Sequence, residues 1–349
     1  MNILLTGTRA PATLDLARRL WREGHRVIGA DSVRCPLGRY SKAFATHHRI
    51  PSARFDRDGF IDSLKRIIGE EKIDLLWPTC EETFYVAARH AELSGETPLM
   101  CDPLAVLEPL HHKLNFARFA GDAAPESWAA EEAPPNRELV WKPFYSRFAM
   151  RTRIGKPPRD RVGWMAQEFI KGEEFSSWAL CQGGEVRALT FYESPGRARL
   201  GAGCAFEPIR DESAAAFVIE TARRLEFTGS LAFDFIRDRS GRFRVIECNP
   251  RLTSGIHVLD ASVSITELLE TPAPLPPPMV PAQLRLPTLF AKPLLAWTSP
   301  DVIRAPDDPG PGTGQIGSFF EFAGIALKHG ISLTAATTFD LEYNGDGSR

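Results

Sequence analysis

The sequence lacks the features that mark several classes of protein. It has six cysteines and no Cys-x-x-Cys pair, so we expect reduced thiols and neither a zinc site nor a disulfide framework. No apolar run approaches the ~20 residues that span a bilayer, and the chain starts without a cationic and apolar leader of the secretory kind. A net charge of −2 indicates no polyanionic partner. We therefore expect a cytoplasmic protein that binds neither nucleic acid nor membrane.

What remains is the composition of an ordinary globular chain. Apolar residues make up 43% and charged residues 25% of the 349 positions, which is typical of a soluble fold. A chain of this length predicts two or three structural units.

Residues 1–102 alternate short apolar strands with helical segments, as in a parallel sheet with crossover helices. The turn Gly7–Ala12 opens a helix and could bind an anion, and Asp31 ends the second strand. However, the Gly-x-Gly-x-x-Gly fingerprint of dinucleotide-binding folds is missing, which disfavours NAD. We expect strands at 2–6, 26–30, 46–50, 74–78 and 98–101, and helices at 14–23, 58–71 and 81–93.

The rest of the chain changes pattern several times. Residues 103–135 have helical spacing, and a proline-rich stretch at 272–281 indicates a stiff, extended connection. Near the end we expect a helix at 319–329, preceded by a mobile glycine-rich and proline-rich loop at 307–317. Between these regions the sequence predicts strands at 138–142, 164–169, 174–181 and 185–192, a helix at 211–226, and a hairpin within 228–257.

This hairpin carries the most chemical information. A two-residue loop at Ser240-Gly241 sets Asp234 opposite Glu247, and alternation puts Asn249 on the same face. Two carboxylates about 5 Å apart repel by roughly 3 kcal/mol at an effective dielectric of about 20. A divalent cation removes that repulsion, and an oxygen-only set suits Mg²⁺. The alternative is an ordinary hairpin with an exposed polar face, its acids paired with neighbouring arginines.

Asp234 and the run Glu247-Cys248-Asn249-Pro250-Arg251 resemble the metal-binding end of ATP-grasp enzymes. The overall pattern is similar to the carbamoyl-phosphate-synthase-like branch of carboxylate–amine ligases, over roughly residues 1–270. The resemblance implies that Asp234, Glu247 and Asn249 bind Mg²⁺, with Mn²⁺ as the alternative, against the phosphates of ATP. It also implies that Arg251 faces the reacting phosphoryl group.

Two lysines fit the same resemblance. Lys142 ends a strand before Pro143, where family members have a lysine that contacts ATP phosphates. Lys113 matches a second family lysine at a helix start, although His112 replaces the acid that usually precedes it. For each lysine alone, the alternative is a solvated surface charge.

The octapeptide 167–174 resembles the hinge between the family's two lobes. The resemblance implies that the backbone of Glu168 and Ile170 reads the adenine edge and that Glu174 meets the ribose hydroxyls. Glu173 is the competing candidate for the ribose.

The chain departs from the family at the flap after Lys142-Pro143. Residues 144–151 contain no glycine, whereas backbone amides normally approach phosphate there. Either Ser146 and Arg147 replace these donors with side chains, or catalysis is lost and only binding remains.

Two further features lie outside these motifs. His257 could contact substrate or act as a base, and the alternative is a structural histidine near a turn. Residues 79–82 follow the fourth strand, at the edge where open α/β sheets bind ligands.

Together these features predict an α/β (α+β) chain, with a Rossmann-like parallel-sheet domain followed by a two-lobed ATP-grasp domain. We expect an ATP-dependent ligase that activates a carboxylate as an acyl phosphate and joins it to an amine, an amino acid being favoured, with release of ADP. Its partners are then a small-molecule carboxylate and amine, and the chain is a monomer or homodimer. A thiol or bicarbonate acceptor, or a nucleotide-binding regulator without turnover, are the alternatives. The expected boundaries are 1–102, 103–271 (small lobe about 136–193, metal-bearing lobe about 194–271) and a C-terminal appendage at 272–349.

Overall fold

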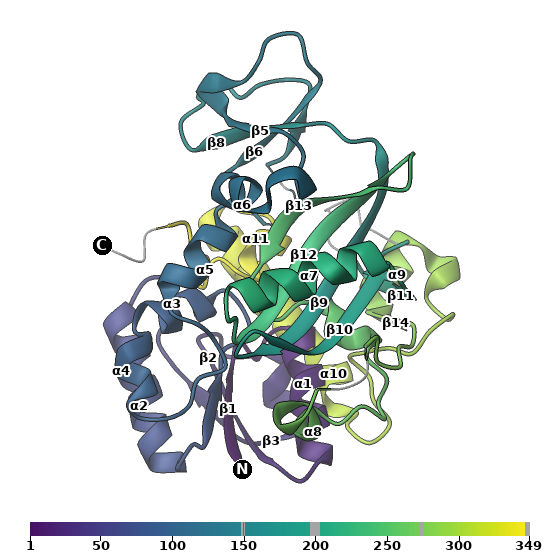
Figure 1. Cartoon of the computed structure of the whole chain (residues 1–349). Helices are drawn as coiled ribbons and strands as arrows, with labels where there is room; N and C mark the ends of the chain where they lie inside the picture. Colours follow the sequence, from purple (N-terminus) through teal and green to yellow (C-terminus); the bar gives the residue numbers. More distant parts are fainter. Residues whose placement is uncertain (148, 150, 196–202, 273–274, 346–349) are drawn as a thin grey trace.

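The computed structural model describes residues 1–147, 149, 151–195, 203–272 and 275–345. It contains a parallel sheet, a small antiparallel sheet and a large antiparallel sheet. In Figure 1 the parallel sheet lies at the bottom, the small sheet at the top and the large sheet between them. Among the described helices, none is both long and apolar enough to cross a bilayer.

The N-terminal domain is a parallel sheet with strand order β3-β2-β1-β4. Successive residues of β1 face opposite sides, so Ile3 and Leu5 pack with α1 while Leu4 packs with α2. The expected fifth strand at 98–101 forms only a bridge from Leu99 to Leu76. The elements are β1 (Asn2–Thr6), α1 (Pro11–Arg22), β2 (Arg26–Asp31), η1 (Leu37–Tyr40), β3 (Phe44–Arg49), α2 (Arg57–Glu71) and β4 (Leu75–Trp77).

The turn after β1 binds a carboxylate of the chain itself, the side chain of Asp31. The backbone N–H and the side-chain Nε of Arg9 both donate to the carboxylate of Asp31, at 2.9 and 3.0 Å. Asp31 is thus engaged by Arg9 and is not presented to a ribose, which agrees with the missing dinucleotide fingerprint.

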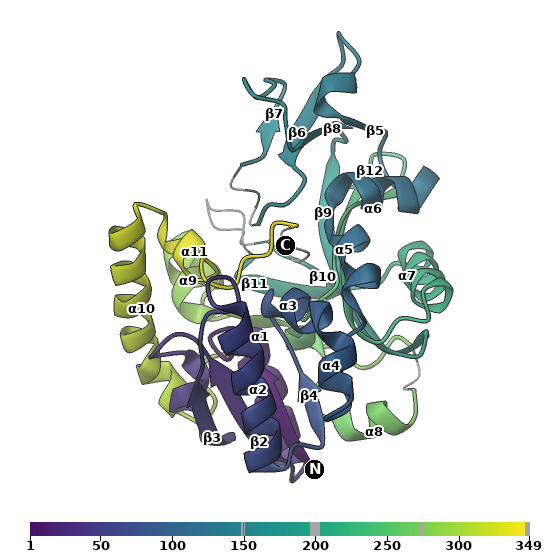
Figure 2. The same ribbon diagram turned by 90° about the vertical axis from the view of Figure 1, so that its left-hand side faces the viewer.

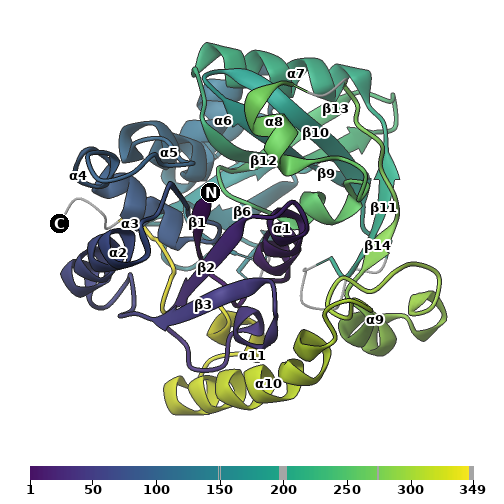
Figure 3. The ribbon, with the colours of Figure 1, turned by 90° about the horizontal axis from the view of Figure 1, so that it is seen from below.

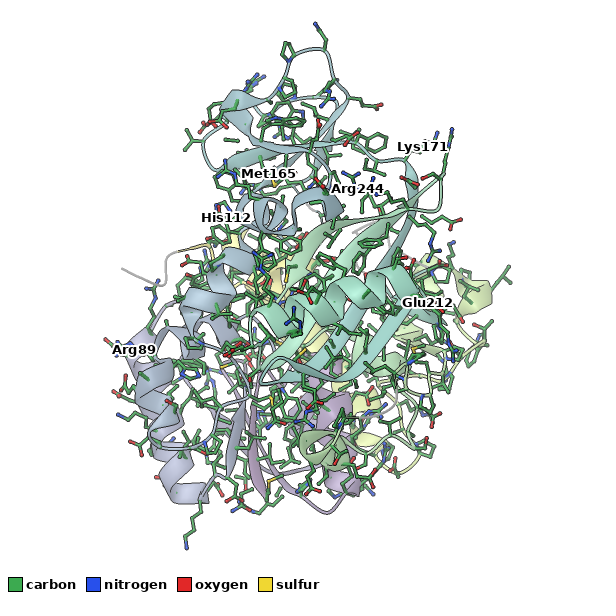
Figure 4. The ribbon with its side chains drawn as sticks, viewed as in Figure 1. Arg89, His112, Met165, Lys171, Glu212 and Arg244 are labelled. Carbon is green, nitrogen blue, oxygen red and sulfur yellow. The ribbon has the colours of Figure 1, made fainter. Side chains whose placement is uncertain are left out.

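Short helices connect this domain to the next sheets. The helix expected at 81–93 is broken at Arg89 into α3 (Glu82–Ala88) and α4 (His90–Ser94). A second break, at His112, separates α5 (Leu104–His111) from α6 (Lys113–Ala120). The imidazole of His112 accepts a hydrogen bond from the backbone N–H of Asn115 and so caps α6. Figure 4 shows His112 at this junction, below the lobe that carries Met165.

The small lobe has the strand order β5-β8-β6-β7. Its compact core contains Trp141 and Trp164. We expected this lobe to extend to residue 193, but β9 and β10 pair in the large sheet, so the lobe ends near Glu168. Strand pattern alone does not show which sheet a strand joins. The strands are β5 (Ser127–Ala129), β6 (Leu139–Pro143), β7 (Arg153–Ile154) and β8 (Trp164–Glu168).

The large sheet has the order β13-β12-β9-β10-β11-β14. On one face Phe233 and Phe235 pack with α7 (Glu212–Arg224). On the other face Trp178 and Leu180 pack with the 3₁₀ helix η4 (Ser254–Val258) and α8 (Ile265–Glu270). The strands are β9 (Gly172–Gln182), β10 (Glu185–Glu193), β11 (Ala205–Ile209), β12 (Gly229–Asp238), β13 (Phe243–Asn249) and β14 (Ala282–Gln283).

The C-terminal appendage returns to the N-terminal domain, as the side and bottom views show (Figures 2 and 3). The prediction of a loop at 307–317 is wrong, because α10 starts at Gly310. Its glycines allow close packing: a Cβ at Gly314 would lie 2.3 Å from the Tyr40 ring. Residues 273–274 of the proline-rich stretch lie outside the described residues. The helices are α9 (Arg285–Ala291), η5 (Pro293–Leu295), α10 (Gly310–His329) and α11 (Leu333–Ala336).

Candidate active site

A cavity of about 600 Å³ is lined by the small lobe, the connection between β8 and β9, and the large sheet. The structure brings most of the expected site residues to this one cavity, although they come from distant parts of the sequence. Lys113 and His257 do not line it. The expected residues that do are Lys142, Ser146, Arg147, Glu168, Ile170, Glu174, Asp234, Glu247, Asn249 and Arg251.

The β12–β13 hairpin pairs Asp234 with Glu247, as expected. The predicted two-residue loop at Ser240-Gly241 is wrong, however. The N–H of Asp238 donates to the carbonyl of Arg242 at 2.9 Å, so the loop has three residues. A register shift follows Asp234, because Phe235 pairs with Val245. This β-bulge offsets the longer turn and restores the pairing of the two carboxylates.

The hairpin offers an oxygen-only set of metal ligands. Asp234 Oδ1 accepts a hydrogen bond from Ser176 Oγ at 2.6 Å, and Asp234 Oδ2 accepts one from Asn249 Nδ2 at 3.3 Å. Within the described part of the chain, no three His, Cys, Asp or Glu side chains gather into a metal site. A metal on this hairpin therefore needs the Asn249 amide oxygen besides the two carboxylates. Such donors fit Mg²⁺, and a cation would relieve the repulsion between Asp234 and Glu247.

Both candidate lysines are buried, so they are not solvated surface charges. Lys113 Nζ donates to the carbonyl of Ser146 at 2.9 Å and lies 3.2 Å from Glu247 Oε1. Lys142 Nζ donates to Gln167 Oε1 at 2.9 Å. Burial, together with the nearby charge of Lys113, lowers the pKa of Lys142 to about 8. Two positive charges thus lie close to the carboxylates of the hairpin.

The start of β9, directly after its connection from β8, holds the two acidic ribose candidates on opposite faces. Glu174 lines the cavity, whereas the Glu173 side chain is 79% exposed and faces Arg237 at 4.0 Å. Alternation along the strand explains the difference. A Cβ at Gly172 would lie 2.1 Å from the carbonyl of Arg237, so glycine lets the start of β9 pack closely on β12. Figure 4 shows Lys171 at the outer end of this connection.

The flap differs from what we expected. Ser146 and Arg147 line the cavity, but Phe148 and Met150 lie outside the described residues. The guanidinium of Arg147 uses all three of its nitrogens on the protein itself: Nε donates to Glu81, NH1 to Asn344 Oδ1 and NH2 to the Tyr343 carbonyl. Arg147 therefore ties the flap to the N-terminal domain and to the C-terminal segment, and this arrangement does not leave it available as a phosphate clamp.

The sequence did not single out Glu81 as a site residue, although we noted its position after β4. Glu81 is buried, pairs with Arg147, and accepts a hydrogen bond from the N–H of Tyr343 at 3.1 Å. Arg251 NH2 lies 4.0 Å from it. Burial alone would raise the pKa of Glu81, but the charge and hydrogen bonds of Arg147 outweigh it and lower that pKa to about 2. Glu81 therefore stays ionised beside the guanidinium groups of Arg147 and Arg251.

The structure does not bring His257 to the cavity as a reactive group. Its ring is buried, with Nδ1 2.8 Å from Asp15 Oδ2 on α1, and packs against Phe206. The structural alternative describes His257 better than a catalytic role. Cys80 is also no nucleophile, because burial and the nearby charge of Glu82 raise the pKa of its thiol.

Residues 112–255 match the family model of the ATP-grasp domain. This part of the chain is therefore an ATP-grasp domain. No curated protein matches the sequence. An ATP-grasp domain implies ATP and Mg²⁺ as cofactors, and the oxygen ligands of the hairpin and the buried lysines fit both.

Three solved structures have a similar fold at low sequence identity. N5-carboxyaminoimidazole ribonucleotide synthetase from Thermus thermophilus is 15% identical, with 80% of this chain and 81% of that chain covered and a TM-score of 0.60. The biotin carboxylase domain of the Hydrogenobacter thermophilus 2-oxoglutarate carboxylase, in complex with MgADP, ADP and bicarbonate, is 13% identical (78% and 70% covered, TM-score 0.59). L-amino acid ligase from Bacillus licheniformis is 16% identical (73% and 68% covered, TM-score 0.54).

Proposed function

We propose that this protein is an ATP-dependent ligase that activates a carboxylate as an acyl phosphate and joins it to an amine, with release of ADP and phosphate. One observation carries the proposal: the metal-ligand set of the hairpin, Arg251 and Lys142 all line the same cavity. Such an arrangement surrounds a triphosphate with positive charge where its terminal bond breaks. The solved neighbours include an L-amino acid ligase and a carboxylase domain with MgADP, which supports this class of reaction.

Different residues of the cavity would bind the metal, the phosphates and the phosphoryl group in transfer. Asp234, Glu247 and Asn249 would hold Mg²⁺, which would supply positive charge to the triphosphate when bound. Lys142 binds phosphate oxygens, and Arg251 stabilises the group in transfer. A carboxylate oxygen of the acid attacks the γ-phosphorus as the bond to the β–γ bridging oxygen breaks and ADP leaves. The amine then attacks the carbonyl carbon, phosphate leaves, and the amine nitrogen loses a proton.

The alternatives differ in the acceptor or in turnover. A thiol or bicarbonate in place of the amine would use the same phosphoryl transfer, so the geometry does not separate them. A regulator without turnover is disfavoured because Lys142, Asp234, Glu247, Asn249 and Arg251 are all present around the cavity. The test is to incubate the protein with Mg-ATP, candidate acids and candidate amines and to measure ADP. Acid-dependent ADP release supports the ligase, while nucleotide binding without ADP release supports the regulator.

Glu174→Ala is expected to weaken ATP binding by about tenfold, whereas Glu173→Ala is expected to leave it unchanged. The loss of a hydrogen bond to a charged group is typically worth about 1.5–3 kcal/mol, or tenfold and more. Glu174 lines the cavity and Glu173 does not, so the two variants form a matched pair on one strand. Isothermal titration calorimetry with an ATP analogue measures both affinities. If Glu173→Ala alone loses affinity, the ribose assignment is wrong.

The lowered pKa of Lys142 predicts proton uptake on nucleotide binding. Lys142 is cationic below about pH 8 and becomes neutral above it. Phosphate stabilises the cation, so affinity should fall as the pH rises through about 8, and Mg-ADP binding at pH 9 should take up a proton. Lys142→Arg should show no uptake, because arginine stays protonated. Calorimetry in two buffers of different ionisation enthalpy, at pH 6.5 and pH 9, measures this. Equal uptake by both proteins at pH 9 would contradict the assignment.

A further inference from the structure

Helix α10 lies along the outside of the molecule and packs on the N-terminal domain with one face only (Figures 2 and 3). The four buried residues that form this inner face are Pro311, Gly314, Ser318 and Phe322. With about 100° of rotation per residue, Ile316, Phe320 and Leu327 lie on the opposite side of the helix. We call this side, with Phe319 and Ala323 at its margin, the outer face of α10.

The outer face is apolar, although it is exposed. A surface helix normally presents charged and polar residues to water, and a helix that is apolar all round is normally buried. Glu321 is the one charged residue among positions 310–327, and its carboxylate accepts hydrogen bonds from the backbone N–H groups of Arg34 and Cys35 at 2.7 and 2.6 Å. This charge is thus turned toward the N-terminal domain, and the outer face has the character of a surface that a partner covers.

Gly324 borders the outer face and has no packing reason within the described chain. A Cβ at this position would meet no described atom within 4 Å, whereas a Cβ at Gly314 would collide with the Tyr40 ring. Glycine in the middle of a helix is less stable than alanine, so its presence here indicates a reason outside the chain. The absence of a side chain lets the backbone of a second helix approach closely.

The exposed apolar area of α10 matches what a small dimer interface needs. The exposed fractions of its four large side chains are 64% for Ile316, 53% for Phe319, 68% for Phe320 and 85% for Leu327. At about 200 Å² for a whole side chain of this kind, they amount to roughly 500 Å². Phe55, which is 59% exposed, lines the groove of about 760 Å³ beside α10 and adds roughly 100 Å² on the same basis. Two copies would then bury about 1,200 Å², the lower limit of specific interfaces.

We infer that a second copy of this chain covers the outer face, with the two α10 helices crossing near Gly324. A two-fold axis sets the same face of each copy against the other, so two uncharged faces meet. Lys328 and Phe320 lie four positions on either side of Gly324. An antiparallel crossing therefore places the Lys328 ammonium of one copy over the Phe320 ring of the other, which is a favourable contact.

This inference goes beyond the proposed ligase reaction and does not depend on it. None of the described residues that line the active-site cavity belongs to α10. Loss of the dimer and loss of ADP formation are therefore separate observations.

The first test is sedimentation velocity of the full chain from about 1 to 100 µM, the range in which a small interface dissociates. The wild type should show a reversible monomer–dimer equilibrium. Phe320→Asp should raise the dissociation constant at least about a hundredfold, because a buried carboxylate without a partner is costly. Phe290→Asp is the matched control: Phe290 is 82% exposed but belongs to α9, so its replacement should leave the equilibrium unchanged.

Three results of this experiment would overturn the inference. They are a wild type that stays monomeric at about 100 µM, a dimer that Phe320→Asp does not weaken, and a dimer that Phe290→Asp weakens as much. Flotation of a monomeric wild type with phosphatidylcholine vesicles would assign the outer face to a lipid surface instead, and would also overturn the inference.

The second test uses Gly324→Ala, for which the inference predicts two opposite effects. The alanine has room in the single chain and favours the helix, so unfolding of the monomer should need more urea. The same methyl group separates the two crossing helices, so the dissociation constant should rise at least about tenfold. Gly69→Ala is the control, because Gly69 lies in α2 and a Cβ there also meets no described atom within 4 Å. The control should raise the urea midpoint alone. An unchanged dissociation constant in Gly324→Ala would contradict the crossing at Gly324, and with it the inference.

Discussion

Replacing Glu247 by Gln is expected to reduce Mg²⁺-dependent ADP formation by about a thousandfold, which corresponds to ~4 kcal/mol. The amide has nearly the same shape but no charge, so the hairpin loses one of two carboxylates for the metal. It also loses the partner of the Lys113 ammonium, 3.2 Å away. The fold should persist, because Glu247 is only partly buried near the end of an edge strand.

The matched control for this experiment is Glu193→Gln. Glu193 ends β10 of the same sheet, is partly exposed, and does not line the cavity. Steady-state ADP release at several Mg²⁺ concentrations should be unchanged in the control. Normal ADP formation by Glu247→Gln would show that the hairpin does not hold the catalytic metal.

Glu81→Ala is expected to lower the free energy of unfolding by about 3–5 kcal/mol. Removing one partner of a buried ion pair leaves the other charge buried and unpaired, here the guanidinium of Arg147. The C-terminal segment should loosen as well, because Glu81 also accepts the Tyr343 N–H and Arg147 donates to the Tyr343 carbonyl. Urea unfolding followed by tryptophan fluorescence measures the loss.

Glu220→Ala provides the comparison for Glu81→Ala. Glu220 pairs with Arg223 on the surface of α7, where ion pairs contribute little, so its removal should hardly shift the urea midpoint. The double variant Glu81→Leu/Arg147→Leu should recover part of the stability lost in Glu81→Ala, because no buried charge remains. If Glu81→Ala unfolds at the same urea concentration as Glu220→Ala, the buried pair does not hold the three parts of the chain together.

The sequence predicted the pairing of Asp234 with Glu247 because its information is local. Alternate residues of a strand share a face, so Asp234, Glu247 and Asn249 could be placed together from parity alone. The turn was derived incorrectly, and the pairing still held only because the bulge after Asp234 offsets the third loop residue. A bulge depends on packing and twist, and neither can be read from strand parity.

Long-range packing explains what the sequence did not predict. Arg147 donates hydrogen bonds to Glu81, 66 positions away, and to Tyr343, 196 positions away. No local sequence pattern predicts such pairs. The glycines in the first half of α10 are typical of a loop in the sequence. In the fold they let Tyr40 pack closely against the helix. His257 had the right position in the sequence for a site residue, but its contact with Asp15 on α1 could be seen only in the fold.

The nucleotide product formed in the presence of hydroxylamine tests the proposed ligase reaction directly. The protein is incubated with Mg-ATP, hydroxylamine and a panel of carboxylic acids, and hydroxamate, ADP and AMP are quantified in the same samples. If the protein forms an acyl phosphate, at least one acid yields hydroxamate with an equal amount of ADP, and Glu247→Gln yields neither. Hydroxamate accompanied by AMP, or no nucleotide turnover with any acid, would contradict this reaction.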